Sequence, residues 1–217
     1  QAQKSQVIAH RGYWKTAGSA QNSITSLQKA DSIHCYGSEF DVWLAKDNKL
    51  VVNHDPVYKM KYMEYSKGDA LTGLKLSNGE NLPSLQKYLE AGKKCNTKLI
   101  LELKAHNSKK RETKAVQEIL AMVKKMGLED RMEYITFSLH AMKEFIRLAP
   151  AGTPVFYLNG ELSPKELKDL GAAGLDYHMG VIKKHPEWIK EAHDLGLKVN
   201  VWTVDKAEDM KWLIDQK

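Results

Sequence analysis

The sequence is poor in cysteine, with only Cys35 and Cys95. Two cysteines are too few for a disulfide scaffold, and their spacing is not that of a zinc site. We interpret both as buried free thiols; the alternative is that they face one another at the bottom of a barrel. A small cysteine-stabilised fold is therefore excluded.

Long apolar runs and dense basic runs are also missing. No segment reaches the roughly 18 apolar residues that a membrane-spanning helix requires, and no signal-like segment occurs. Lys and Arg outnumber Asp and Glu by 33 to 27, a formal charge of +6, but they are spread along the chain. No basic run with interleaved aromatics occurs, so we expect no nucleic-acid partner.

The chain begins with Gln1 rather than Met. Removal of a signal peptide would explain this start, and so would trimming of the chain. We expect an exported protein, periplasmic or extracellular, rather than a cytoplasmic one. The sequence carries no signal for the oligomeric state.

Short β-rich runs alternate with longer segments of helical periodicity, which predicts an α/β fold with a parallel sheet closed or flanked by helices. Helix ends are marked by Ser163 before Pro164, and by Gly127, Gly171 and Gly196, where left-handed C-caps belong. The expected strands are Gln6–Ala9, Ser38–Trp43, Lys98–Leu103, Tyr134–Phe137, Val155–Leu158, Leu175–Tyr177 and Lys198–Thr203. The expected helices are Asn22–Ser32, Ser84–Ala91, Lys109–Met126, Ala141–Leu148, Pro164–Leu170, Pro186–Leu195 and Lys206–Ile214.

The length of 217 residues fits one domain, residues 1–217, and is common for a single α/β barrel. Seven strands and a final helix are found, so a closed (β/α)8 barrel lacks its eighth strand at the C-terminal end. Either the chain continues beyond Lys217 or the barrel is open, and we favour the first because an open edge promotes aggregation. Residues 55–82 have little periodicity and are interpreted as a short insertion, a loop or small excursion.

Acidic residues cluster near the ends of two expected strands. Glu39 and Asp41 are two apart, so both carboxylates lie on one face, and Glu102 ends the next apolar strand. Three such carboxylates suit a hard cation, Mg²⁺ or Ca²⁺, although solvated acids at a strand end are the alternative. Lys104, on the same face as Glu102, is placed to bind a phosphate oxygen or to form an ion pair with Glu102.

Two histidines lie at similar positions. His10 ends the first strand and is followed by Arg11, whose planar fork suits phosphate, and by Gly12, which permits a tight turn. His54 closes the apolar run at Leu50–Val52. Because imidazole titrates near neutral pH, two such residues at one centre can act as base and acid, although each taken singly is more often a surface or packing residue.

The ordered runs VIAHRG, QNSITSLQKA, GSEFDVWLAKDNKLVVNHDP, LILELK and KVNVWTVD resemble the glycerophosphodiester phosphodiesterase family over nearly the whole chain. The family's fold is a TIM barrel, and its active site is a divalent-metal centre flanked by two histidines. The resemblance implies His10 and His54 as acid and base, Glu39, Asp41 and Glu102 as ligands of one Ca²⁺ or Mg²⁺ ion, and Arg11, Lys104 and Trp202 as substrate-binding residues.

The resemblance has one departure near the site and leaves alternatives. The family usually has Glu-Asn-Thr where this chain has Gln21-Asn22-Ser23, which replaces a carboxylate by a neutral amide. Trp202 would form a wall for the alcohol part of the substrate, or pack in the core. The implied reaction releases glycerol 3-phosphate and an alcohol from a small glycerophosphodiester.

Two other functions stay open. One is a phosphodiesterase for lysophospholipids or other lipid phosphodiesters, favoured by an apolar entrance around Tyr58, Met60, Tyr62, Met63 and Tyr65. This stretch is also lysine-rich, so contact with a membrane surface is possible. The other is a catalytically weak protein that binds a phosphate ligand, against which the two histidines argue.

Overall fold

The computed structural model describes residues 6–216. The chain divides into two compact units, the first ending at Glu133 and the second beginning at Tyr134. None of the helices in the described part of the chain is both long and apolar enough to cross a membrane.

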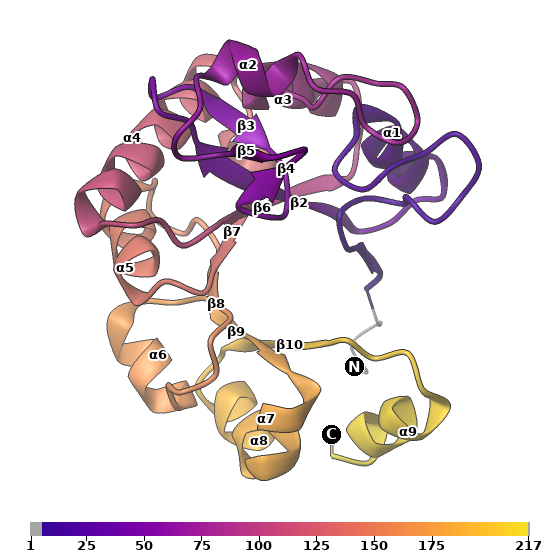
Figure 1. Ribbon diagram of the computed structural model, residues 1–217. Helices are drawn as coiled ribbons and strands as arrows, with labels where there is room; N and C mark the ends of the chain where they lie inside the picture. Colours follow the sequence, from indigo (N-terminus) through magenta and orange to yellow (C-terminus); the bar gives the residue numbers. More distant parts are fainter. Residues whose placement is uncertain (1–5, 217) are drawn as a thin grey trace. The chain divides into compact units, whose positions relative to one another are not determined.

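The first unit is built on three parallel strands, β1 (Ile8–Ala9), β2 (Gly37–Leu44) and β6 (Lys98–Leu103), and β3 (Leu50–Val52) pairs with β2 in the antiparallel sense (Figure 1). Every residue of β2 is buried, as is typical of a strand covered on both faces. The helices of this unit are α1 (Ile24–Ser32), α2 (Gly68–Thr72), α3 (Leu85–Lys93) and α4 (Lys109–Lys125), followed by the short helix η1 (Glu129–Arg131).

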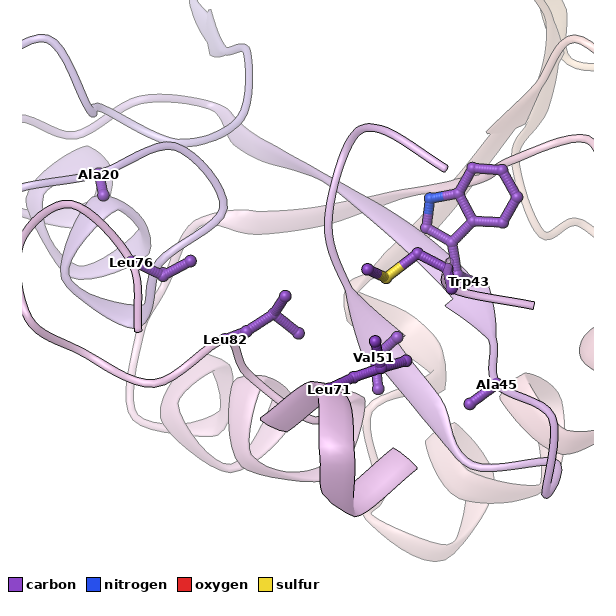
Figure 2. Packing of buried hydrophobic residues seen from close by; sticks show 8 residues of the cluster. Ala20, Trp43, Ala45, Val51, Leu71, Leu76 and Leu82 are labelled. Carbon is purple, nitrogen blue, oxygen red and sulfur yellow. The ribbon is translucent and has the colours of Figure 1, made fainter. Parts of the chain in front are cut away.

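The insertion has structure of its own. It contains α2 and a hairpin of two short strands, β4 (Val57–Tyr58) and β5 (Lys61–Tyr62). Strands of two residues are too short to give a recognisable pattern, which is why the sequence indicated a loop or small excursion without naming its elements. Figure 2 shows how the insertion joins the sheet, through a buried cluster of Met63, Leu71, Leu76 and Leu82 with Ala20, Trp43, Ala45 and Val51.

The second unit continues the alternation. The last three residues of β7 (Met132–Thr136) pair with β8 (Val155–Tyr157), which pairs with β9 (Gly174–His178), and β9 pairs with β10 (Lys198–Trp202), all in parallel. The helices of this unit are α5 (Leu139–Leu148), α6 (Pro164–Leu170), α7 (Met179–Lys184), α8 (Glu187–Asp194) and α9 (Ala207–Asp215).

The predicted α/β organisation is confirmed. The seven expected strands correspond to β1, β2 and β6–β10, and within residues 6–216 no eighth parallel strand follows them. The helix ends also agree, because Ser163 and Glu166 form a capping box and Gly171 is a left-handed C-cap. Helix α7 was not expected, since its six residues are too few for a periodic signal. Cys35 and Cys95 are buried and free, in agreement with the first interpretation.

Candidate active site

Strands β2 and β6 bring three carboxylates together. Glu39 and Asp41 share one face of β2, and the parallel register pairs Asp41 with Glu102 of β6. One oxygen of each side chain lies within 4.8 Å of the other two, and all three residues are buried. The acids are therefore not solvated groups at a strand end.

Burial and mutual repulsion dominate the electrostatics of this cluster. Burial is the largest cause that raises the pKa of Glu39, Asp41 and Glu102 to about 7, and the charge of a neighbouring carboxylate is the next. Lys104 opposes the shift, because its Nζ lies 3.0 Å from Glu102 Oε2. Lys104 thus forms an ion pair with Glu102, which was one of the two interpretations of this residue from the sequence.

The cluster fits a divalent cation. Among the described residues, none donates a hydrogen bond to the buried atoms Glu39 Oε1 and Asp41 Oδ1. Buried carboxylate oxygens without donors are suitable ligands for a hard cation, and oxygens bound to one Ca²⁺ at about 2.4 Å lie roughly 3.4–4.8 Å apart. Glu39, Asp41 and Glu102 would hold the ion.

The turn after β1 attaches the first histidine to this cluster. Arg11 and Gly12 have φ values of 56° and 76°, and a Cβ on Gly12 would lie 2.2 Å from Ser26 Oγ, so this position requires glycine. The turn directs the Arg11 backbone N–H to Glu39 Oε2 (2.8 Å). His10 Nδ1 lies 3.1 Å from the same oxygen.

The Arg11 side chain connects this turn to the second histidine. One terminal nitrogen donates to Gln21 Oε1 (2.6 Å) and the other to His54 Nε2 (2.8 Å). Because guanidinium only donates, His54 Nε2 accepts, and His54 Nδ1–H therefore donates to Asp55 Oδ1 (2.6 Å). The amide oxygen of Gln21 thus holds Arg11.

His106 links the ends of β2 and β6. Its Nδ1–H donates to Lys104 O (2.6 Å) and its Nε2 accepts from the backbone N–H of Leu44 (2.9 Å). A ring nitrogen that accepts requires a neutral imidazole, and burial lowers the pKa of His106 in the same direction. The structure therefore gives His106 a supporting position beside the site.

Two residues of the site were missed from the sequence. Asn22 donates to Asp41 Oδ2 (2.9 Å) and accepts from the Asp41 backbone N–H (3.1 Å), which fixes the middle carboxylate. Asp55 orients His54. The only available signal was adjacency, since each follows a residue that the sequence had singled out, Gln21 or His54.

Trp202 belongs to the second unit and ends β10. Its indole N–H donates to Asp176 O (2.9 Å), and its ring makes edge contacts with Phe137 and His178, at centroid distances of 6.0 and 4.9 Å. The three rings follow or end the strands β7, β9 and β10. Trp202 is half-buried.

A cavity of the first unit lies elsewhere. Its volume is about 1000 Å³, and its lining comes from residues around β3, α2, α3 and α4. None of the candidate catalytic residues belongs to that lining. The convergence of buried charges locates the candidate active site.

The sequence matches the model of the glycerophosphoryl diester phosphodiesterase family over residues 10–217. The chain is 26% identical, over 97% of its length and 90% of the relative, to a glycerophosphodiester phosphodiesterase of Caldanaerobacter subterraneus subsp. tengcongensis.

Solved structures agree. A glycerophosphodiester phosphodiesterase from Parabacteroides distasonis has a TM-score of 0.94 at 53% identity, over 97% of this chain and 89% of that one, which confirms the predicted TIM-barrel-type fold. An Oleispira antarctica phosphodiesterase, in complex with the product sn-glycerol-3-phosphate, has a TM-score of 0.81 at 22% identity, over 98% and 90% of the two chains. With a family match over nearly its whole length, the chain belongs to the glycerophosphoryl diester phosphodiesterase family.

Proposed function

We propose that this protein hydrolyses glycerophosphodiesters to glycerol 3-phosphate and an alcohol. The observation that carries the proposal is a buried cluster of three carboxylates beside two imidazoles, each with its Nδ1 near a carboxylate oxygen. Such an arrangement suits a cation-dependent phosphodiester cleavage with an acid and a base. The family membership and the product named for the Oleispira protein support it.

The cation would be Ca²⁺ or Mg²⁺ bound by Glu39, Asp41 and Glu102, and it supplies Lewis-acid stabilisation of charge on the phosphate. Arg11 offers two guanidinium nitrogens to phosphate oxygens, and Lys104 offers a point charge beside the cluster. Trp202 would contact the alcohol part. We propose that residues 1–217 form one catalytic domain.

The two histidines are assigned different tasks. His54 Nε2 accepts a hydrogen bond, so it carries a lone pair and is in the form required of a base. His10 Nδ1 lies 3.1 Å from Glu39 Oε2, an oxygen that can accept from Nδ1–H while Nε2–H of the same ring donates to the leaving alcohol. We therefore assign His54 as the base and His10 as the acid.

The proposed cleavage involves two proton transfers, one at each histidine. A phosphate oxygen of the substrate takes over the Arg11 guanidinium, which releases His54 Nε2. His54 accepts a proton from the attacking water as its oxygen bonds to phosphorus. The bond from phosphorus to the departing alcohol oxygen breaks, and that oxygen receives the proton of His10.

The first test is release of glycerol 3-phosphate from glycerophosphocholine, glycerophosphoethanolamine and glycerophosphoinositol, with Ca²⁺, with Mg²⁺ and with EDTA. We expect cation-dependent release that His10→Ala and His54→Ala abolish. His193→Ala, which changes an exposed histidine on α8, is the matched control and should keep full activity. No release from any of the three, with cation bound, would contradict the proposal.

A second substrate separates the acid from the base. Glycerol phosphate esterified to p-nitrophenol has a leaving group that needs no proton, so it should restore activity to His10→Ala but not to His54→Ala. Restored activity in His54→Ala but not in His10→Ala would make His10 the base and His54 the acid.

Cleavage of lysophospholipids, with no cleavage of glycerophosphodiesters, would show that the substrate is a lipid phosphodiester.

A further inference from the structure

The hairpin that begins three residues after His54 ends in an exposed tip, residues 59–62. Met60 is 93% exposed, Tyr62 is 55% exposed and Tyr65, just beyond β5, is 66% exposed. The rings of Tyr62 and Tyr65 contact each other at a centroid distance of 6.0 Å. An isolated exposed apolar residue is ordinary, but three within six residues form a patch.

The backbone of the tip is strained. Lys59 and Met60 both have positive φ, 46° and 65°, at the two central positions of a hairpin turn. Such turns favour Asn-Gly, and a residue with a long side chain destabilises them. Because Met60 is almost fully exposed, no packing in the fold compensates. A strained position that holds an exposed apolar side chain indicates a function for that side chain.

Contacts with the body of the first unit fix the base of the hairpin. Met63 is fully buried in the cluster shown in Figure 2, and the Tyr58 hydroxyl donates to Lys75 O (2.9 Å). The tip therefore projects as a fixed element rather than folding back onto the protein.

The charge of the tip is positive. Lys59 and Lys61 flank Met60 and are exposed, as is Lys67 beyond Tyr65. The acid within this stretch, Glu64, is directed toward the body of the protein, because both its oxygens accept from the backbone N–H of Asn107 (3.2 Å). Lysines around an apolar residue are complementary to a lipid layer, which has anionic headgroups at its surface and an apolar interior beneath them.

We propose that the 59–62 tip, with Tyr65, docks on an anionic phospholipid surface. Met60 would enter the interfacial layer, Tyr62 and Tyr65 would lie at headgroup level, and Lys59 and Lys61 would contact lipid phosphates. A protein partner fits less well, because one hairpin tip offers far less than the roughly 800 Å² per partner of a stable interface. The proposal is independent of the hydrolytic reaction.

The test is sedimentation of the whole protein with vesicles of phosphatidylcholine, with and without phosphatidylglycerol. We expect binding to the anionic vesicles only, weakened by salt. Met60→Asp should weaken binding to the anionic vesicles about ten-fold or more, since an apolar contact is replaced by a carboxylate that the anionic lipid repels. Met210→Asp, at a 54% exposed methionine on α9, is the matched control and should bind as the parent does.

Two double variants test whether a loss of vesicle binding has a cause other than unfolding of the protein. Lys59→Asn with Met60→Gly gives the turn its favoured residues, so it should be at least as stable as the parent and yet lose vesicle binding. Lys59→Glu with Lys61→Glu should weaken binding about five-fold for each lysine removed, or more. Lys124→Glu with Lys125→Glu applies the same charge change at the exposed end of α4 and should have less effect.

Three outcomes would overturn the proposal. The first is no binding to either vesicle, and the second is equal binding to both. The third is binding by the Asn-Gly variant that equals that of the parent. Self-association of the parent, lost in Met60→Asp and without vesicle binding, would instead assign the tip to contact with a second copy.

Discussion

At the scale of single residues, the protein keeps a cluster that works against its own stability. Three carboxylates are buried together, and Lys104 forms an ion pair with one of them, Glu102. Desolvation and repulsion both disfavour the ionised cluster. A bound divalent cation reverses the sign of this contribution, because it stabilises the ionised form and binds only the folded site.

Asp41→Asn tests this conflict. In EDTA at pH 8 the variant should be more stable than the parent, by roughly 1–3 kcal/mol, because it removes a carboxylate whose pKa is raised to about 7. It should also lose both the stabilisation by cation and the activity. Denaturant titration with and without cation measures the effects. Asp169→Asn, at an exposed acid on α6, should change neither, and a destabilised Asp41→Asn protein would contradict the account.

The stability of the cation-free protein should depend on pH. The folded-state pKa values of about 7 lie above the ordinary 4.5 of Glu and 3.8 of Asp, so between about pH 4 and pH 7 the folded protein binds more protons than the unfolded chain. The free energy of unfolding contributed by the cluster therefore falls as pH rises through this window. Calorimetry in EDTA at pH 5 and pH 8 should give the higher Tm at pH 5 from this contribution.

Saturating cation should remove most of that difference, because the bound carboxylates are ionised at both pH values. A Tm that rises from pH 5 to pH 8 equally with EDTA and with cation would show that other groups dominate.

At the scale of elements, the turn after β1 positions most of the charged contacts. Gly12 has positive φ and no room for a Cβ, whereas Gly18 has almost the same φ, 78°, with no atom within 4 Å of the position that a Cβ would occupy. Gly18→Ala should therefore cost about 1 kcal/mol of unfolding free energy, which is the strain alone. Gly12→Ala adds the overlap with Ser26 and should cost roughly 2–4 kcal/mol.

Activity separates the two glycine variants further. Gly12→Ala should also lose activity, because the N–H of Arg11 and the ring of His10 both depend on this turn. Denaturant titration and the glycerol 3-phosphate assay on both variants check this. Equal losses would contradict the steric argument.

How far the sequence predicts this fold differs between elements. Helices such as α6 are predictable because Ser163, Pro164 and Gly171 mark both ends locally. The placement of Glu39 and Asp41 on one face follows from alternation along β2. The contacts of Asn22 and Gln21 are not predictable in this way, since they depend on a left-handed turn and on a guanidinium that arrives from another segment.

At the scale of the whole molecule, the proposed cation ligands all belong to the first unit, on β2 and β6. Cation should therefore slow amide hydrogen exchange in these two strands more than in α6 and α8 of the second unit. Exchange measured by mass spectrometry in EDTA and in cation would show this. Uniform protection of both units would instead mean that the chain opens as one cooperative body.

The hydrogen bond from Arg11 to His54 Nε2 has a consequence for covalent labelling. The lone pair of an imidazole nitrogen attacks acylating reagents, and in the ligand-free protein the lone pair of His54 Nε2 accepts a hydrogen bond from the Arg11 guanidinium. An oxyanion that draws Arg11 away would expose it. Small anions should therefore accelerate the modification of His54, whereas ligands ordinarily shield the residues of a site. The same guanidinium that receives the phosphate thus acts as a chemical cap on the base until the phosphate arrives.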